Sequence, residues 1–394
     1  MRINLLIVLL LALLPITNTH AKIAEHSEIN TAPVTTPTSE ASKPDLSNKE
    51  ISDLTPEEVT KQVFQAIEAS DEMAIKPLLN ALTYYKHNDE GETALTLAIQ
   101  NDDEEMVSLL VEDAVINLKN KAGETPLTLA IKKGNPKIIE LVSKRAKAAL
   151  KNDAGEAPLF LAIENDDLFL IQKLINKGAD VNRKSNGTSP IAQATQLNKA
   201  RVLALLIRNG ANPSQANCNG DLPLYLAVKN NFDVVSGILL HKSKQADEDA
   251  NWMNQIGEPL INIAAAEGNT QIVRTLLEFG ASPNSVDMME NTPLNIAAEK
   301  GDLTTMQLLV ENGATVNHAN IMGTTPIMAA ARNGHNEVAS QLALLGADPE
   351  LRDYSGIAAN DYGDFKAKLI LLDEEADAVF MYDEPSSDDD KGNQ

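Results

Sequence analysis

The chain has 394 residues, of which 43% are hydrophobic but only 4% are aromatic, which argues against one large core built on Phe and Trp. Its formal net charge is −23, so nucleic acids and anionic membrane surfaces would repel it. A basic or neutral protein is therefore the expected partner. The length allows two or three ordinary domains or one extended repeat array.

The first 21 residues have the pattern of a secretory signal peptide. Arg2 is followed by the apolar residues 5–14 and by Pro15, and Thr19 and Ala21 supply small side chains before the predicted cleavage point. The apolar stretch is shorter than the roughly 20 residues of a transmembrane helix, and no later stretch approaches that length. We expect export across the inner membrane, with no membrane span, to the periplasm if the source is a Gram-negative bacterium. Secretion from the cell is the alternative.

The next segment, residues 22–53, is rich in Ser, Thr and Pro and contains no aromatic residue, which is typical of a disordered tether. Order is predicted to begin just before Thr55, because Thr55 and Glu58 form a capping box with Pro56 at the first helical position. These residues predict an N-terminal helical capping unit at the start of an ordered domain that spans residues 54–372.

A short motif recurs nine times from residue 91 onward. In the copy AGETPLTLAI, which begins at Ala122, a turn glycine precedes a capping threonine, a proline and an apolar run. The turn positions of the nine copies are Gly91, Gly123, Gly155, Gly187, Gly220, Gly257, Glu290, Gly323 and Gly356. Successive copies are 32, 32, 32, 33, 37, 33, 33 and 33 residues apart, so one unit carries a four-residue insertion near Trp252. Such regular self-similarity indicates a repeat array.

Each copy encodes a tight turn followed by two short helices. The glycine permits a positive φ, Thr or Ser caps the first helix, and Pro occupies its first position. One such helix pair cannot cover its own apolar face, so neighbouring pairs must stack.

The core G-x-T-P-L-x-x-A, the closing G-A-D-x-N and the period of about 33 residues resemble the ankyrin repeat over roughly residues 54–372. The resemblance implies an all-α repeat solenoid. It would stack about nine helix-turn-helix units after the N-terminal capping unit, with hairpin fingers at right angles to the helices and a concave face that binds other proteins.

Several positions depart from the family pattern. Ankyrin repeats commonly have His two residues after the Pro, bonded to the preceding Thr. The residues at this position are Thr96, Thr128, Phe160, Ala192, Tyr225, Asn262, Asn295 and Met328. We therefore expect that internal hydrogen bond to be absent throughout. Leu222 replaces a capping Thr and Glu290 replaces a turn Gly, each costing about 1 kcal/mol locally. Stability is expected to be lowest around residues 220–260.

No catalytic signature was found, neither G-x-S-x-G nor H-E-x-x-H nor a glycine-rich phosphate loop. Cys218 is the only cysteine, so no internal disulfide can form, and an inert thiol is predicted. His335 follows Gly334 at a repeat turn and is expected to be structural. The pair Asp102 and Asp103 is interpreted as solvated turn acids rather than Ca²⁺ ligands. We expect a non-catalytic protein without a cofactor or metal site.

The two residues before each turn position should lie at the fingertips, and their chemistry changes along the chain. Early pairs such as Asp89-Glu90 are polar, whereas later pairs such as Met288-Met289 are apolar. Six of the ten methionines fall between Met253 and Met328. Exposed apolar patches mark interaction sites, and Met adapts to irregular partner surfaces.

The predicted partner-binding residues are therefore Trp252, Ile256, Met288, Met289, Ile321, Met322 and Tyr354 at the fingers, with Glu299, Lys300, Arg332 and Asn333 of the inner helices lining the same groove. The alternative is that adjacent fingers pack these apolar side chains against one another.

The last 22 residues, 373–394, contain nine acidic residues and one lysine and are predicted to form a disordered acidic tail. Together these patterns predict a monomeric, exported, non-catalytic scaffold. It would bind a protein partner, and no nucleic acid, on the concave finger and inner-helix face, mainly in the repeats after residue 250. A secreted factor that acts on a host protein is the first alternative. An enzyme with a cryptic site, which the missing motifs oppose, and a purely structural role are the others.

Overall fold

A computed structural model describes residues 54–79, 87–111 and 114–362. Within these residues the secondary structure consists of 19 α-helices, short 3₁₀ helices and isolated β-bridges, as the predicted all-α repeat solenoid requires. The predicted signal peptide (1–21), tether (22–53) and acidic tail (373–394) lie outside the described residues. So does the end of the predicted repeat domain, residues 363–372.

Apart from α14, the helices come in pairs, each with an inner helix followed by an outer helix. The inner helices are α2 Pro56–Glu68, α4 Ala94–Gln100, α6 Pro126–Lys133, α8 Pro158–Glu164, α10 Pro190–Gln196, α12 Pro223–Lys229, α15 Leu260–Ala266, α17 Pro293–Lys300 and α19 Pro326–Arg332. The outer helices are α3 Glu72–Ile75, α5 Glu104–Leu110, α7 Pro136–Arg145, α9 Leu168–Asn176, α11 Ala200–Arg208, α13 Asp233–Lys242, α16 Thr270–Glu278, α18 Leu303–Glu311 and α20 Asn336–Leu344. The 3₁₀ helices include η3 Ala114–Asn117 and η4 Ala359–Asp361, and η4 belongs to the ninth copy of the motif.

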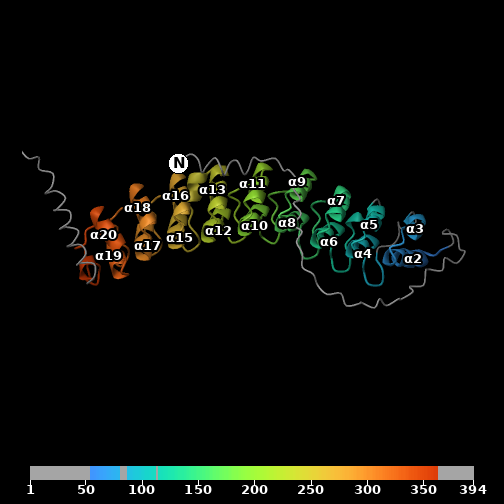
Figure 1. The fold of residues 1–394 in the computed structure, drawn as a ribbon, viewed down its shortest axis with the longest axis horizontal. Coiled ribbons are helices and arrows are strands. Elements are labelled where there is room, and N and C mark those ends of the chain that lie inside the picture. The colour runs from blue at the N-terminus through green and yellow to red at the C-terminus, as the bar shows by residue number, and fades with distance from the viewer. Residues whose placement is uncertain (1–53, 80–86, 112–113, 363–394) are drawn as a thin grey trace, which may run out of the picture. The chain divides into compact units, whose positions relative to one another are not determined.

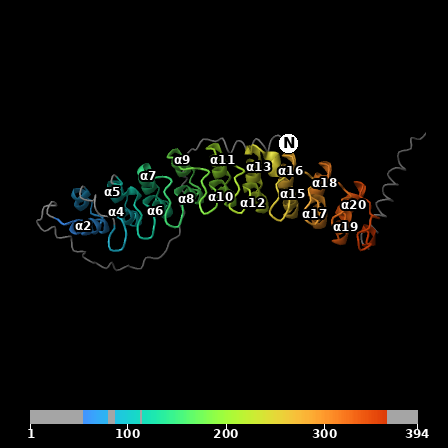
Figure 2. The same ribbon diagram turned by 180° about the vertical axis from the view of Figure 1, so that it is seen from behind.

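The described residues form two compact units, one from those in 54–190 and 204–209 and one from those in 191–203 and 210–362. In the first unit α2, α4, α6 and α8 contact one another in succession. In the second, α12, α15, α17 and α19 form one row and α13, α16, α18 and α20 the other (Figures 1 and 2). The predicted stacking of helix pairs on their neighbours is confirmed within each unit.

The apolar residues of the motif make these interfaces. Leu95 and Ile99 of α4 and Leu127 and Ile131 of α6 are all fully buried. Within each helix the two residues are four positions apart and so lie on one face. The core of each unit is thus a series of interfaces between consecutive pairs.

An Asn or Asp three residues before the turn position organises eight of the nine fingers, a role that the repeat pattern alone did not predict. Asn88 Oδ1 accepts a hydrogen bond from the backbone N–H of Glu92 at 2.8 Å, and the N–H of Asn88 donates to the Glu92 carbonyl at 2.9 Å. The side-chain bond is repeated by Asn120, Asn152, Asn217, Asn254, Asp287, Asn320 and Asp353. Both bonds close the finger into a hairpin with two residues at its tip.

The turn glycines have a positive φ, a backbone conformation that favours glycine. At several fingers the next finger along the chain also leaves no space for a Cβ atom at the glycine. Gly123 has φ 77°, and a Cβ placed on it would lie only 2.4 Å from Cβ of Asp153. The N–H of Asp153 donates to the Gly123 carbonyl at 2.9 Å. Gly134, at the end of α6, has a similar φ of 83° but open space around it.

The expectation that the bond to the capping Thr is absent throughout is wrong. Thr93 N–H donates to Thr96 Oγ1 at 2.8 Å, and Thr96 N–H donates back to Thr93 Oγ1 at 3.0 Å. The same reciprocal pair joins Thr125 to Thr128, and Asn295 takes the part of the second Thr in the pair with Thr292. A Thr hydroxyl or an Asn amide at this position accepts a hydrogen bond from the backbone N–H of the capping Thr, and so replaces the His of the family pattern. The reciprocal pair has the geometry of a capping box.

Four consecutive helices, α12, α13, α14 (Ala246–Ala250) and α15, begin without a side-chain cap. They span the region 220–260 for which the lowest stability was predicted. The insertion that contains α14 is anchored by the buried Asp249 carboxylate, which accepts hydrogen bonds from the hydroxyls of Ser214 and Ser243 at 2.5 Å each. That the region is the least stable remains a prediction.

The contact between fingers predicts unequal effects of two Gly→Ala substitutions. Gly134→Ala should lower the free energy of unfolding by about 1 kcal/mol, because only the left-handed backbone is strained. Gly123→Ala should lower it by about 2 to 4 kcal/mol, because the new methyl also overlaps Asp153. Urea unfolding followed by circular dichroism measures both changes. Equal losses would contradict the finger contact.

The capping boxes predict opposite effects at equivalent positions of two consecutive repeats. Thr125→Ala should reduce the free energy of unfolding by about 1 kcal/mol, since it removes the cap of α6. Ala157→Thr should increase it by about 0.5 to 1 kcal/mol, since Ala157 precedes α8 without a side-chain bond. The same urea titration applies, and a loss of stability in Ala157→Thr would show that the site cannot accept a cap.

Candidate functional site

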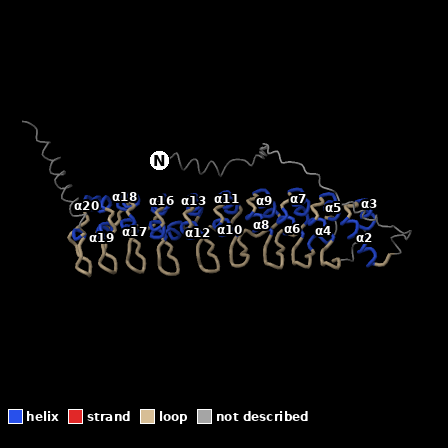
Figure 3. Tube along the Cα trace, turned by 60° about the horizontal axis from the view of Figure 1, so that its bottom comes forward, coloured by secondary structure: helices blue, strands red, loops and turns tan. Residues whose placement is uncertain are grey.

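The fingertips of the second unit carry a row of exposed apolar side chains, which we call the tip row. Its members are Ile256, Met288, Met289, Ile321, Met322 and Tyr354. Met288 is 75% exposed and Tyr354 is 83% exposed. In Figure 3 the fingers before α15, α17 and α19 extend beyond the helices on one side. The tip row thus lies at the ends of loops that the repeat interfaces hold in place.

Contacts between successive fingers make members of the row neighbours. The N–H of Ile321 donates to the Met289 carbonyl at 3.0 Å, and the N–H of Tyr354 donates to the Met322 carbonyl at 3.2 Å. The side chain of Met288 lies against Gly257, where a Cβ would come within 3.3 Å of Met288 Cγ. The fingers therefore contact one another through backbone atoms and a glycine, while the apolar side chains stay largely exposed.

Trp252 lies apart from the tip row. Its side chain is half-buried, and its ring centroid is 5.3 Å from that of Tyr225 on α12, at an interplanar angle of 44°. The Nζ of Lys229 lies 5.7 Å from the centroid of the Tyr225 ring. Trp252 thus already packs within the protein, against the inner helix of the preceding repeat.

The four predicted polar residues form a separate exposed group. Glu299 and Lys300 are the last residues of α17, Arg332 is the last residue of α19, and Asn333 is its C-cap. The fingertips precede the opposite, N-terminal ends of these helices, and a helix of eight residues is about 12 Å long. The structure therefore brings the tip row together at the fingers and leaves the polar group at the far ends of the inner helices.

The fingertips of the first unit are polar instead. Lys119 Nζ lies 2.6 Å from Asp153 Oδ1, so an ion pair connects two successive fingers. Below the tips, Lys132 Nζ bridges Glu124 Oε1 at 2.7 Å and Glu156 Oε2 at 2.5 Å. The fingertip residue Asp153 of the first unit is thus part of a charged pair, whereas the corresponding fingertips that form the tip row of the second unit are apolar.

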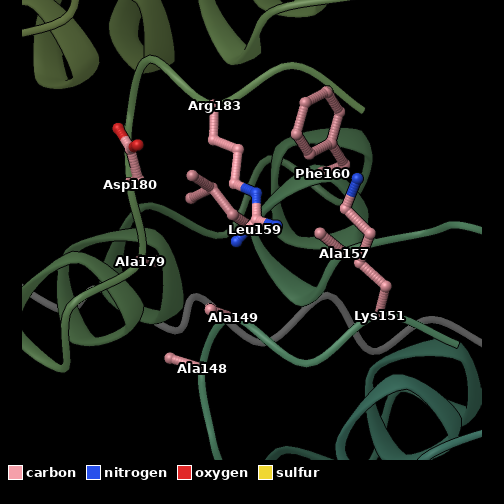
Figure 4. A pocket seen from close by; sticks show the side chains of 9 residues that line it. All are labelled: Ala148, Ala149, Lys151, Ala157, Leu159, Phe160, Ala179, Asp180 and Arg183. Carbon is pink, nitrogen blue, oxygen red and sulfur yellow. The ribbon is translucent and has the colours of Figure 1, made fainter. Parts of the chain in front are cut away.

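A shallow hollow in the first unit is the other surface feature with a defined lining. Ala148, Leu159 and Ala179 form part of its wall. In Figure 4 the side chain of Arg183 extends toward Leu159, whereas the carboxylate of Asp180 points away from it. The hollow has a cationic rim but no converging set of acids, bases and nucleophiles, which an active site would need.

A model described as ankyrin repeats, three copies, matches residues 63–153, 159–251, 238–320 and 261–353. The chain belongs to the ankyrin repeat family. Members of this family generally mediate protein–protein interaction and act as non-catalytic scaffolds. A solved structure, the ankyrin repeat domain of Bcl-3, described as a unique member of the IkappaB protein family, is 26% identical. The match covers 52% of this chain and 92% of that one, with a TM-score of 0.48. No curated protein matches the chain.

Potential metal ligands of these ankyrin repeats do not gather into a centre. Residues 54–79, 87–111 and 114–362 contain no group of three His, Cys, Asp or Glu able to hold a metal ion. Cys218 is an exposed free thiol. The ring of His335 fills the space beside Gly301, where a Cβ would come within 2.5 Å of its Nδ1, so this histidine packs against the preceding repeat. None of the helices in the described part of the chain is long and apolar enough to cross a membrane.

The Lys132 network shifts the pKa values of its members. Burial of Glu124 raises the pKa of its carboxyl, but hydrogen bonds from Lys132, Asn152 and Thr128 outweigh burial and hold the pKa below its ordinary value. Hydrogen bonds from Lys132 and Asn152 likewise lower the pKa of Glu156. Burial lowers the pKa of Lys132, but the two glutamates more than reverse this and raise it.

These directions predict a pH-dependent contribution to stability. Since folding lowers both carboxyl pKa values, the network stabilises the protein above the ordinary glutamate pKa of about 4.3. This stabilisation is lost as the pH falls through the lowered values. Lys132→Met should reduce the free energy of unfolding at pH 7 by roughly 0.5 to 1 kcal/mol, a small loss because the group is partly solvent-screened. The difference from the unchanged protein should vanish near pH 2.5.

The neighbouring Lys133→Met is the control, because Lys133 donates to the backbone carbonyl of Gln100 rather than to a carboxylate. Urea unfolding of both variants at several pH values measures the effect. A loss in Lys132→Met that is the same at pH 7 and pH 2.5 would rule out the ionic network as its cause.

Proposed function

We propose that this ankyrin-repeat protein is an exported, non-catalytic scaffold that binds a protein partner through the tip row. The observation that carries the proposal is the set of six apolar side chains at neighbouring fingertips, 46 to 83% exposed. Isolated apolar residues on a surface need no explanation, but a contiguous set marks an interaction site. The hairpin turns hold these side chains on short, hydrogen-bonded fingers, so little ordering is needed when a partner binds.

The size of the row limits the affinity. Full burial of one such side chain yields roughly 1.5 to 3 kcal/mol. Association costs about 4 to 15 kcal/mol in lost freedom of motion. Six side chains that are already partly covered in the unbound protein therefore support binding in the micromolar range, about −8 kcal/mol. Tighter binding would require polar contacts as well.

Export is proposed from residues 1–21 alone, whose order of a basic residue, an apolar stretch and small residues is that of a signal peptide. The proposed partner is accordingly a protein of the periplasm. A chain recovered from the culture medium rather than from a periplasmic extract would instead favour the secreted form that acts on a host protein.

Site-specific crosslinking tests the tip row. A photoreactive phenylalanine analogue placed at Met322 should give a crosslinked band of defined mass in intact cells, whereas the same analogue at Asp153, a fingertip of the first unit, should not. The substitutions Met288→Ser and Met289→Ser should abolish the band, because they remove the apolar surface on the neighbouring finger.

The control is Met73→Ser, since Met73 is 77% exposed but lies on α3, away from the fingers. Thermal unfolding checks that each variant is folded. A band that survives Met288→Ser with Met289→Ser, or that appears equally from Asp153, would contradict binding through the tip row.

A further inference from the structure

The fingers that carry the tip row bear charge of almost one sign. Residues 253–258, 286–291, 319–324 and 352–357 contain the carboxylates of Glu258, Asp287, Glu290 and Asp353 and a single cation, Arg352. Arg352 is exposed but already paired within the chain, since it donates to the Gly356 carbonyl at 2.6 Å and pairs with Asp361 Oδ2 at 3.0 Å. The apolar side chains are therefore rimmed by negative charge.

Two of these carboxylates are not required by the finger turn. Asn254 and Asn320 close their fingers with a neutral amide oxygen that accepts from the N–H four residues later, at 2.9 and 3.0 Å. Asp287 and Asp353 accept the same bond at 2.8 and 3.0 Å. Asp287 Oδ2 also accepts from Asn291 Nδ2 at 3.1 Å. An amide serves the backbone bond of the turn equally well, so that bond does not require the charge that Asp adds beside the tip row at these two positions.

Glu290 occupies the turn position that is glycine in the other eight copies. It keeps the left-handed backbone, with φ 57°, and its side chain is exposed. Its carbonyl accepts from His318 Nε2 at 2.9 Å, and its N–H donates to the Asp287 carbonyl at 2.9 Å, so its peptide groups are fixed on both sides. A left-handed non-glycine residue is strained. The protein thus keeps an exposed carboxylate next to Met289, within the tip row, on a residue whose backbone is strained.

We infer that the tip row takes a cationic, amphipathic segment of a protein partner. Apolar side chains of that segment cover Met288, Met289 and Ile321, and a Lys or Arg between them pairs with Glu290. Glu258 and Asp287 add to the attraction. An acidic protein or an anionic bilayer would be repelled by the same rim. The inference rests on the proposed function, because it names the chemistry of the partner for the same surface.

Synthetic peptides test the charge requirement. Three fluorescent 14-residue peptides share their Leu and Met positions and differ only in having Lys, Gln or Glu at the polar positions. Titrated with the full chain at low salt, the Lys peptide should bind at least tenfold more tightly than the Gln peptide, and the Glu peptide should not bind. The advantage of Lys should shrink as NaCl is raised, because salt screens exposed charges.

Substitutions at Glu290 separate binding from stability. Glu290→Gln should weaken binding of the Lys peptide three- to tenfold and leave both the Gln peptide and the urea midpoint unchanged. Glu290→Gly should weaken binding equally but raise the urea midpoint, because it relieves the left-handed strain. Glu337→Gln, which removes an exposed carboxylate on α20, is the matched control and should leave all of these values unchanged.

The outcomes distinguish the inference from the proposed function. If Met288→Ser with Met289→Ser weakens binding of the Lys and Gln peptides alike while Glu290→Gln changes neither, the surface binds but the charge inference is wrong. No binding of the Lys peptide at 1 mM would overturn the inference as well. The inference would also be overturned if sedimentation showed dimers, or if the protein bound phosphatidylcholine vesicles, and either effect was lost on substitution of the tip row. If the methionine substitutions change nothing in cells or with peptides, the proposed function itself fails.

Discussion

The structure depends on one constraint, that a pair of short helices cannot cover its own apolar face. Leu95, Ile99, Leu127 and Ile131 are buried because α4 and α6 lie against each other, not because either helix encloses them. The same dependence extends into the fingers. The N–H of Lys121 donates to the Gly91 carbonyl at 2.7 Å, so successive hairpins are positioned by one another. Each repeat is thus specified by its neighbours as much as by its own residues.

This constraint explains why the fingertips can differ so much between the two units. The tip residues contribute backbone bonds to the next finger, whereas their side chains are not needed for the helix interfaces. The first unit therefore carries charged tips such as Lys121 and Asp153, and the second carries Met288 and Met322, on the same hairpin. A change of tip chemistry alters the surface without altering the fold, which is why the apolar character of the second unit is informative about binding.

Charged residues have two different roles in the protein. In the first unit, Lys132 is paired with Glu124 and Glu156, and hydrogen bonds lower the pKa values of both carboxyls. In the second unit, Glu290 is exposed on a strained backbone beside apolar side chains. The paired charges stabilise the fold, whereas an exposed carboxylate on a strained backbone does not. Backbone strain of this kind is commonly retained where function requires it.

The period, the helix pairs, the capping Thr and Pro residues and the chemistry of each fingertip could all be predicted from the residues alone, because these follow from local turn geometry and from packing on the adjacent repeat. Which side chains contact one another became visible only in the folded protein. The structure showed that Trp252 packs on Tyr225, that Thr96 and Asn295 replace the expected imidazole, and that Met288 stays exposed beside Gly257. The reason is physical, since a periodic pattern fixes the conformation of one repeat, whereas distances between side chains of different repeats depend on how the repeats are stacked.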